Sequence, residues 1–221
     1  MPRTPRENKE VEKTRDEILD QALAIIGKEG YANLSMRKLG DALGCAAKTI
    51  YNYYTGKEEI YIRVLTCGFE KMNALAELAL EGIADPLEQM RALIATYIRF
   101  GTENANYYNI MFNWNVPKYM DYVGTVLEPI ARVEKEVAFH FIEISKKPLT
   151  ILAKGTPITE EDLTFIIIRL WSALHGLVSL INSGSLREFE MDQNECISCI
   201  TESLLKECTE CTTTMNERGN L

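Results

Sequence analysis

Hydrophobic residues recur every three or four positions along most of the chain, which is the spacing of one face of an α-helix. The first such pattern runs from Val11 to Ile26, and Gly30 follows it, as glycine follows the end of many helices. A second and shorter pattern lies in MRKLGDALG (36–44), directly after Ser35, a residue type that favours the N-cap position. These two segments predict a long helix followed by a short one.

A third short helix is predicted in AAKTIYNYY (46–54), beyond a turn at Gly44 and Cys45. Two short helices joined by a glycine-containing turn are typical of the helix-turn-helix motif, whose second helix enters a DNA major groove. Thr55 and Gly56 interrupt the chain again, and a long helix is predicted from Lys57 toward Glu81.

The remainder of the chain also has a helical pattern. Asp85 and Pro86 combine a good N-cap with a first-turn proline, and Thr159 with Asp162 resembles a capping box. Breaks are expected at Pro117, Pro148 and 154–157, which leaves helices near 86–100, 103–113, 118–147, 160–182 and 192–210. We therefore predict an all-α protein with a mobile N-terminal arm (1–10), a three-helix module containing the helix-turn-helix (11–57) and a larger helical domain (58–221).

Composition supports a globular helical protein. The chain has 221 residues, of which 46% are hydrophobic and 25% charged, with only 13 Gly and 7 Pro. Six cysteines are too few for a disulfide-stapled scaffold, and the polar start MPRTPRENKEVEK lacks the apolar stretch of a signal peptide. We expect a reduced, cytoplasmic protein.

One segment, Leu163–Ile181, is nearly apolar over a length that could cross a membrane. Arg169 near its centre would cost about 2.5–3.5 kcal/mol on insertion scales, and three acidic residues at 160–162 adjoin the segment. We therefore predict a buried helix of a soluble protein and no membrane partner.

The distribution of charge matters more than its total. The net charge is −8, but residues 1–57 hold ten Lys and Arg against eight Asp and Glu, so the remaining residues carry the whole excess of negative charge. The N-terminal module is thus the part of the chain that can approach phosphate without repulsion.

Residues 15–65 resemble the TetR family of bacterial transcriptional regulators. The segments RDEILDQALAIIGKEGY (15–31), LSMRKLGDALG (34–44) and TIYNYYTGKEE (49–59) follow the order and spacing of that family's three-helix DNA-binding module. Two positions depart from the family pattern: Ala46 replaces a usual serine cap, and Lys48 replaces a usual small residue. The resemblance implies a homodimer that binds double-stranded DNA at a palindromic operator.

A second resemblance concerns the C-terminal domain. Trp171, His175 and Gly176 in RLWSALHGLVSLI, together with NYYNIMF (106–112), are similar to a TetR subgroup with a Trp, His, Gly triplet in this domain. The resemblance implies a repressor that an unknown small, apolar effector releases from DNA.

The DNA-contacting residues can be sorted by chemistry, because phosphate contacts fix register and base contacts specify sequence. We expect Ser35, Arg37 and Lys57 to bind phosphate, and Lys48 and Asn52 to reach guanine and adenine edges, respectively. Thr49 and Tyr51 fit a phosphate or a thymine methyl group. For each residue the alternative is a solvated polar side chain on a short helix.

Aromatic and Met residues concentrate between Tyr97 and Tyr122, as the lining of an apolar effector site would. The candidate ligand-binding residues are Tyr97, Tyr108, Met111, Trp114, Tyr122, Trp171 and His175. Taken one by one, ordinary core packing is the more frequent role of such residues. In the last predicted helix, an apolar stripe is expected to form the dimer interface: Ile197, Ile200, Leu204 and Cys208.

Nothing in the sequence indicates an enzyme, a resident metal or a cofactor. His140 and His175 are the only histidines, and no GxSxG, HExxH or phosphate-binding glycine loop occurs. The alternative reading is a helical small-molecule-binding protein, or a metal or redox sensor using Cys196, Cys199, Cys208 and Cys211. On one continuous helix the two CxxC pairs would lie about 18 Å apart, too far to share an ion at a Zn–S distance of about 2.3 Å.

Overall fold

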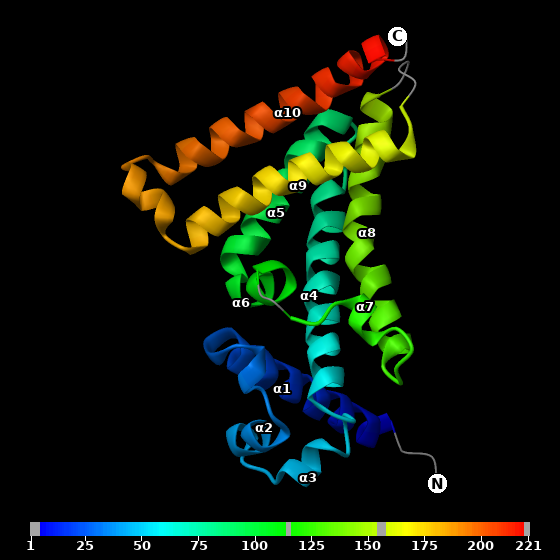
Figure 1. The fold of residues 1–221 in the computed structure, drawn as a ribbon, viewed down its shortest axis with the longest axis vertical. Helices are drawn as coiled ribbons and strands as arrows, with labels where there is room; N and C mark the ends of the chain where they lie inside the picture. The colour runs from blue at the N-terminus through cyan, green and yellow to red at the C-terminus, as the bar shows by residue number, and fades with distance from the viewer. Residues whose placement is uncertain (1–4, 114–115, 154–157, 219–221) are drawn as a thin grey trace. The chain divides into compact units, whose positions relative to one another are not determined.

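The computed structural model describes residues 5–113, 116–153 and 158–218, without the side chains of 5–8, 113 and 211–218. Every regular element in these ranges is helical (Figure 1). In chain order they are α1 (Pro5–Glu29), the 3-10 helix η1 (Tyr31–Asn33), α2 (Met36–Leu43), α3 (Ala47–Ile50), α4 (Lys57–Leu80), α5 (Pro86–Glu103), α6 (Ala105–Tyr108), the π-helix η2 (Asn109–Asn113), α7 (Tyr119–Tyr122), α8 (Glu128–Leu152), α9 (Glu160–Asn182), the 3-10 helix η3 (Ser185–Phe189) and α10 (Gln193–Arg218). The predicted all-α class is confirmed.

The chain divides into two compact units. The first comprises Met1–Phe69 with Asn106–Val137, and the second comprises Glu70–Ala105 with Ala138–Leu221. These units do not coincide with the predicted division at residue 58, because α4 and α8 each run from one unit into the other. The segment after residue 105 belongs with the N-terminal helices because it packs on the first half of α4: a Cβ at Gly68 would lie 2.8 Å from the Tyr107 ring.

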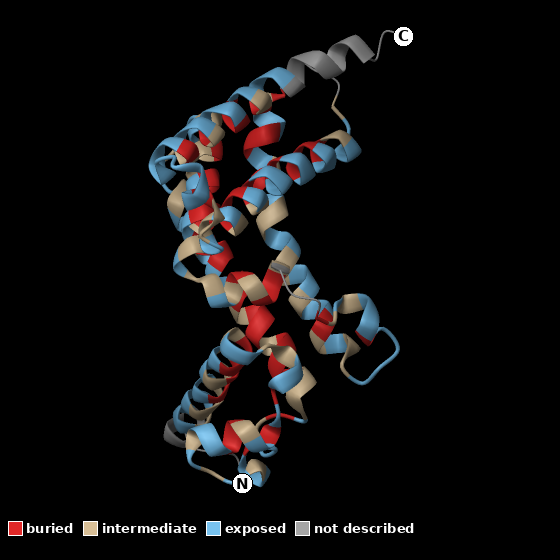
Figure 2. Ribbon diagram, turned by 60° about the vertical axis from the view of Figure 1, so that its left-hand side comes forward, coloured by how far each residue is buried: buried red, intermediate tan, exposed pale blue. Residues whose placement is uncertain are grey.

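The first unit is built around buried residues of α1, α2 and α4. Ile18, Ala22 and Ile26 recur at helical spacing on α1 and are at most 1% exposed, as is Leu39 of α2. Figure 2 shows buried residues on the facing sides of these helices. The periodicity that predicted the helices therefore also identified the residues that join them.

The turn between α2 and α3 depends on two glycines. Gly44 ends α2 in the left-handed conformation at φ 67°, where an L-residue is strained. At Gly40 a Cβ would lie 2.6 Å from the Cys45 carbonyl oxygen and 3.0 Å from the Ala47 nitrogen. The two short helices therefore approach so closely that position 40 has no room for a side chain.

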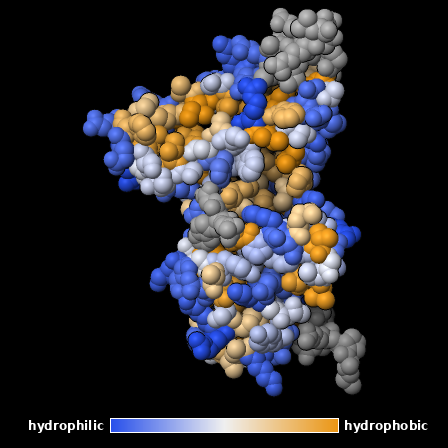
Figure 3. All heavy atoms as spheres, viewed as in Figure 1, coloured by the Kyte–Doolittle hydropathy of each residue, from blue (hydrophilic) through white to orange (hydrophobic). Residues whose placement is uncertain are grey.

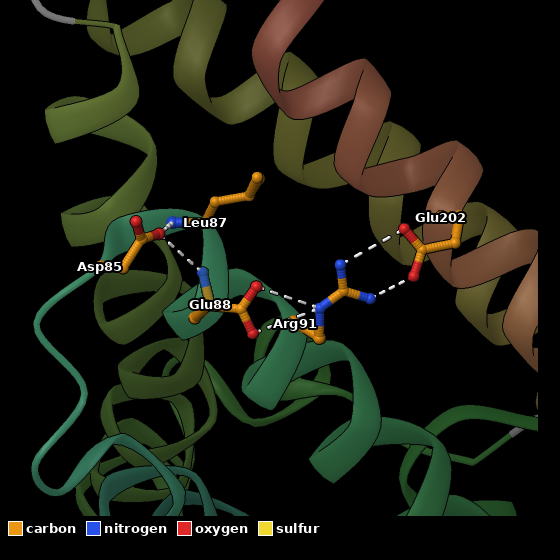
Figure 4. A network of polar contacts seen from close by, with 5 residues as sticks. All are labelled: Asp85, Leu87, Glu88, Arg91 and Glu202. Carbon is orange, nitrogen blue, oxygen red and sulfur yellow. Dashed lines mark hydrogen bonds and ion pairs between the residues drawn. The ribbon is translucent and has the colours of Figure 1, made fainter.

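The second unit packs α5, α9 and α10 against one another. The Asp85 carboxylate caps α5 by accepting from the Leu87 and Glu88 amides at 2.8 and 3.1 Å. Arg91 of the same helix pairs with Glu88 and with Glu202 of α10 (Figure 4). The capping box at Thr159 and Asp162 begins α9, as predicted.

α9 is long and apolar enough to span a membrane by length and composition, and a third of its most apolar 18-residue window is buried. Leu163, Ile166, Leu170 and Leu174 lie on its buried face. Phe165, Ile168 and Trp171 are 55, 47 and 43% exposed. The helix predicted to be buried is therefore buried on one face in this single chain, while its opposite face remains exposed.

Three sequence predictions about helix boundaries were wrong. Residues 5–10 belong to α1, while the rest of the predicted arm lies outside the described residues. The predicted helix 118–147 is interrupted between α7 and α8, where Gly124 has φ 80°. Pro148 does not end α8, which continues to Leu152, because Ile144 and Leu149 on either side of the proline are buried at 3 and 1% exposure.

Candidate functional site

The exposed polar residues of the helix-turn-helix lie on and just beyond α3. α3 is a single turn, and Asn52 follows it in a turn in which its amide donates to the Thr49 carbonyl at 3.1 Å. Lys48, Thr49, Tyr51 and Asn52 are all exposed, and Tyr51 is 56% exposed. Four of the predicted DNA-contacting side chains thus project from one five-residue segment of the surface.

Two buried residues hold this segment in place. Ile50 is 1% exposed and Tyr54 is 3% exposed. The Tyr54 hydroxyl donates to the Arg15 carbonyl at 3.3 Å, and the Arg15 guanidinium lies over the Tyr54 ring at 4.7 Å. Burial raises the pKa of Tyr54 to about 12, so the phenol stays neutral and remains a donor. Tyr54 therefore packs in the core of the first unit.

The caps of the two short helices differ. The Ser35 hydroxyl accepts from the Lys38 amide at 3.2 Å at the start of α2, whereas Ala46 provides no side-chain cap for α3. Ser35 and Arg37 are both exposed in the first turn of α2. The absent cap predicted at Ala46 is confirmed, and α3 relies on Ile50 and Tyr54 for its position.

Lys57 begins α4 on a turn that a buried carboxylate organises. Glu59, 7% exposed, accepts from the Thr55 amide at 2.7 Å and from the Thr55 hydroxyl at 2.8 Å. The Lys57 ammonium lies 4.9 Å from the centre of the Tyr31 ring. The lysine is therefore held at a helix N-terminus, where backbone amides and its own charge both favour an anion.

The predicted ligand-binding residues fall into two groups. In the second unit, the Trp171 indole donates to the Tyr97 hydroxyl at 2.8 Å, and the Trp171 and His175 rings lie 5.8 Å apart. Tyr97 is 2% exposed, and its ring lies 6.1 Å from that of Phe141. Burial lowers the pKa of His175, which favours the neutral imidazole. This group is therefore largely apolar, with a hydroxyl and an imidazole as its hydrogen-bonding groups.

The other ligand-binding candidates belong to the first unit. Tyr108 and Met111 are 0 and 4% exposed, and the Tyr108 ring lies 5.1 Å from that of Phe112. Tyr122 is 7% exposed, and its hydroxyl has no hydrogen-bond partner among the described residues. Trp114 lies outside the described residues.

Sequence reasoning missed the polar neighbours of Tyr122. Tyr61 of α4 is fully buried, and its hydroxyl lies 3.4 Å from the Pro117 carbonyl. Glu134 of α8 is half-buried, and burial raises its pKa to about 7. Glu134 stands in VEKEV beside exposed residues, Val133 before it and Lys135 and Glu136 after it, so nothing in the sequence pattern separates it from a solvated position.

The α10 stripe predicted as a dimer interface is largely internal to the chain. Leu204 and Cys208 are 5 and 0% exposed because this side of α10 packs on α5 and α9. Ile197 and Ile200 are half-buried. The assignment of Leu204 and Cys208 to an exposed dimer face is therefore corrected: periodicity located the apolar stripe but not what covers it.

The four C-terminal cysteines lie on one uninterrupted helix, α10. Cys196 and Cys208 are buried and Cys199 is exposed, while the side chain of Cys211 lies outside the described residues. Among the residues that can be described, no three His, Cys, Asp or Glu side chains are grouped as metal ligands. Because the helix does not break, the two CxxC pairs of one chain cannot converge on one ion.

Comparison with known families agrees with this geometry. The profile of bacterial regulatory proteins of the TetR family matches residues 18–64, and the profile of the tetracyclin repressor-like C-terminal domain matches residues 90–204. The second match alone covers more than half of the chain. The chain therefore belongs to the TetR family of bacterial regulatory proteins.

Individual relatives match over part of the chain. The HTH-type transcriptional repressor NicS of Pseudomonas putida is 32% identical over 87 residues, which is 39% of this chain and 41% of NicS. The HTH-type transcriptional repressor KstR of Mycobacterium tuberculosis is 28% identical over 80 residues, or 36% of each chain. The aligned segment thus spans about two fifths of the length of these relatives.

Solved structures share the fold over nearly the whole length. FadR of Bacillus halodurans, a fatty acid degradation regulator, has a TM-score of 0.63 at 17% identity and covers 93% of this chain and 97% of its own. FadR of Bacillus subtilis in complex with stearoyl-CoA has a TM-score of 0.63 at 18% identity and covers 86% of this chain and 96% of its own. At these identities the likeness establishes the fold.

Proposed function

We propose that the protein is a DNA-binding transcriptional repressor that acts as a homodimer on a palindromic operator. The observation that carries the proposal is the exposed segment Lys48–Asn52, which Ile50 and Tyr54 anchor beside the close α2–α3 turn. Family membership supports the same role for this segment. A rigid scaffold that presents polar side chains on one short helix is suited to reading base edges in a major groove.

The roles of the individual residues follow from their chemistry. Lys48 and Asn52 reach base edges, since lysine serves guanine acceptors and asparagine pairs with adenine. Lys57, Ser35 and Arg37 bind phosphate from helix N-termini. Because Asn52 follows α3 rather than lying within it, its side chain depends on the turn before Tyr54 for its direction.

Thr49 and Tyr51 complete the contact surface at phosphates or thymine methyl groups. Tyr51 exposes more than half of its side chain although it stands next to the buried Ile50. An exposed large aromatic residue at this place is available to a partner.

The dimer is supported by the uncovered face of α9. Phe165, Ile168 and Trp171 recur every three residues and remain about half exposed in one chain. Figure 3 shows hydrophobic residues at the surface of the part formed by α9 and α10. A second copy of the chain, packed along α9 with Ile197 and Ile200 at the edge, would bury this face. The homodimer would then carry two α3 helices, and reading successive major grooves requires them about 34–36 Å apart.

Release from DNA is assigned to a small effector bound in the helical C-terminal region. Two separate aromatic groups, around Tyr97 in the second unit and around Tyr108 in the first, each offer the apolar surface that such a site needs. B. subtilis FadR, which shares the fold, was solved with stearoyl-CoA. The effector shifts DNA affinity by no more than its own difference in affinity between the two states of the repressor.

The test begins by selecting duplexes from a random library with the full chain and footprinting those that are enriched. We expect an inverted repeat with half-sites one helical turn apart. The logarithm of affinity should fall linearly with the logarithm of salt concentration, and Lys57→Ala should reduce the slope by about 0.9, the value for one phosphate.

Lys206→Ala on α10 is the matched control, because it removes the same charge from an exposed side chain of the second unit. Its salt slope should equal that of the unmodified protein. If no duplex is enriched and binding shows no salt slope, the repressor function is refuted, and the chain is a helical small-molecule-binding protein instead.

A further inference from the structure

The Tyr122 hydroxyl is a buried polar group that the fold does not satisfy. Tyr122 ends α7 and is 7% exposed, and its hydroxyl has no hydrogen-bond partner in the part of the chain that the structure describes. Leaving such a group unpaired costs about 1–3 kcal/mol. A bound water, ion or ligand group can satisfy an unpaired hydroxyl of this kind.

The charges that face this hydroxyl are mainly negative. Burial is the largest cause that raises the pKa of Tyr122, and the neighbouring Tyr31 phenol is the next. The charges of three carboxylates raise this pKa further, and no cation offsets them: Glu58, Asp121 and Glu134. Glu134 also raises the pKa of Tyr61, although burial is the larger cause. The charges of three carboxylates, one each from α4, α7 and α8, therefore act on one unpaired phenol.

Lys118, the cation whose charge acts on Glu134, already has a hydrogen-bond partner. The Lys118 ammonium donates to the Met111 carbonyl at 3.3 Å, and the Lys118 amide donates to the Asp121 carboxylate at 2.7 Å as part of the cap of α7. Lys118 lowers the pKa of Glu134 by less than burial raises it, so that the net value is about 7. No hydrogen bond or ion pair joins Glu134 to another described side chain, so the charge of Lys118 offsets its negative charge only in part.

Aromatic rings form the rest of these surroundings. Tyr61 is fully buried, and its ring lies 4.7 Å from that of Tyr31. Ring faces of this kind attract cations, and carboxylates beside them strengthen the attraction. The Lys57 ammonium already lies over the Tyr31 ring at 4.9 Å, which shows that a cation is accommodated against this aromatic group.

We propose that Tyr122, Tyr61 and Glu134 bind the positively charged end of the effector, an amine or a quaternary ammonium group. This inference rests on the proposed effector-controlled function and specifies the chemical class of the effector. A cation supplies the counter-charge that Glu134 lacks, and the Tyr122 oxygen turns its lone pairs toward it. An anionic group would instead meet three carboxylates, with one lysine in compensation.

The proposed cation site is connected by side-chain contacts to Lys57, the residue proposed to bind a DNA phosphate. The Tyr61 ring packs against the Tyr31 ring at an angle of 53°, and the Lys57 ammonium lies over the Tyr31 ring. A second cation beside Tyr61 repels Lys57 and competes for the negative face of these rings. Effector binding therefore disturbs the side chain to which a phosphate contact is assigned, which couples the site to DNA affinity through a continuous set of contacts.

The test compares three probes of equal chain length, hexyltrimethylammonium, hexan-1-ol and hexanoate, by calorimetric titration of the full protein at pH 8. The cationic probe should bind at least tenfold more tightly than either of the others. Glu134→Gln should weaken its binding at least tenfold, and Tyr122→Phe should weaken it severalfold.

Glu136→Gln is the matched control, because Glu136 is exposed on the same helix. It should leave the dissociation constant of the cationic probe within twofold of the unmodified value. The inference is overturned if hexanoate or hexanol binds best, if no cationic binding is detected, or if Glu134→Gln and Glu136→Gln behave alike.

Operator binding separates this failure from failure of the proposed function. If the protein binds a selected duplex but does not bind hexyltrimethylammonium, the proposal of a cationic effector is refuted, while the proposed repressor function is still supported. If the protein binds the cationic probe through Glu134 but enriches no duplex, the proposed repressor function is refuted, while the cation site is still supported.

Discussion

The close approach of α2 and α3 at Gly40 makes one substitution especially informative. In Gly40→Ala the new methyl group would lie 2.6 Å from the Cys45 carbonyl oxygen and 3.0 Å from the Ala47 nitrogen. Both atoms belong to the backbone of the turn, so no side-chain rotation relieves the contact. We expect the turn, and α3 with it, to move away from α2 by several tenths of an ångström.

Two opposing energies set the size of the effect. Alanine stabilises a helix interior by about 1 kcal/mol relative to glycine. Overpacking against a fixed backbone costs about 1–3 kcal/mol. We expect a net loss of stability of about 1 kcal/mol, which lowers Tm by roughly 2–4 °C for a chain of this size. Operator affinity should fall at least tenfold, because base contacts from α3 require a fixed geometry.

Gly44→Ala provides the matched comparison. Nothing lies within 4 Å of a Cβ at Gly44, but its φ of 67° strains any L-residue. This substitution should cost about 1–2 kcal/mol of stability while leaving operator affinity within threefold, measured well below Tm. If Gly40→Ala binds the selected duplex as tightly as the unmodified protein and melts no earlier, the argument from close helix packing is wrong.

Three further changes test other parts of the structure. Ala46→Ser supplies the cap that α3 lacks and should raise stability by about 0.5–1 kcal/mol, seen as a higher midpoint in urea. Trp171→Phe removes the indole donor to the buried Tyr97 hydroxyl and should cost about 1 kcal/mol; an unchanged midpoint would show that this hydrogen bond contributes nothing. The pKa of Glu134 is raised by burial to about 7, above its unfolded value, so the folded protein binds this proton more tightly. The stabilisation from that proton is present at low pH and is lost as pH rises toward 7, and Glu134→Gln should raise Tm at pH 8 but not at pH 4.5; equal shifts at both pH values would contradict this linkage.

Local signals explain which helix boundaries could be predicted. Ser35, Gly44, Asp85 and Thr159 each act within one turn of their own position, and each begins or ends a helix at the expected place. Such caps depend on the backbone beside them rather than on distant residues, so a single sequence contains them.

The boundaries that failed depended on distant packing. Pro148 removes a hydrogen bond that an isolated helix would need, but the buried residues around it keep α8 continuous. The break near Gly124 has the opposite origin: the local pattern continues, while the chain turns at a left-handed glycine. In both places long-range burial or turn geometry overrides the local preference.

The candidate site divides in the same way. The polar segment after Gly44 and the lysine after Gly56 could be found from sequence because the spacing of the helix-turn-helix is local. The group around Tyr122 could not, because Glu134 and Tyr61 come from helices far apart in the chain and look like an ordinary surface glutamate and an ordinary core tyrosine.

By itself, the sequence determined the helical class, the order of the N-terminal helices and the residues that face solvent from α3, because periodicity and caps are properties of neighbouring positions. The tertiary structure decided what covers each apolar stripe: Leu204 and Cys208 are buried within one chain, while Phe165 and Ile168 remain exposed. A stripe specifies that a partner is needed, but which surface supplies it depends on how separate helices pack, and no local pattern contains that information.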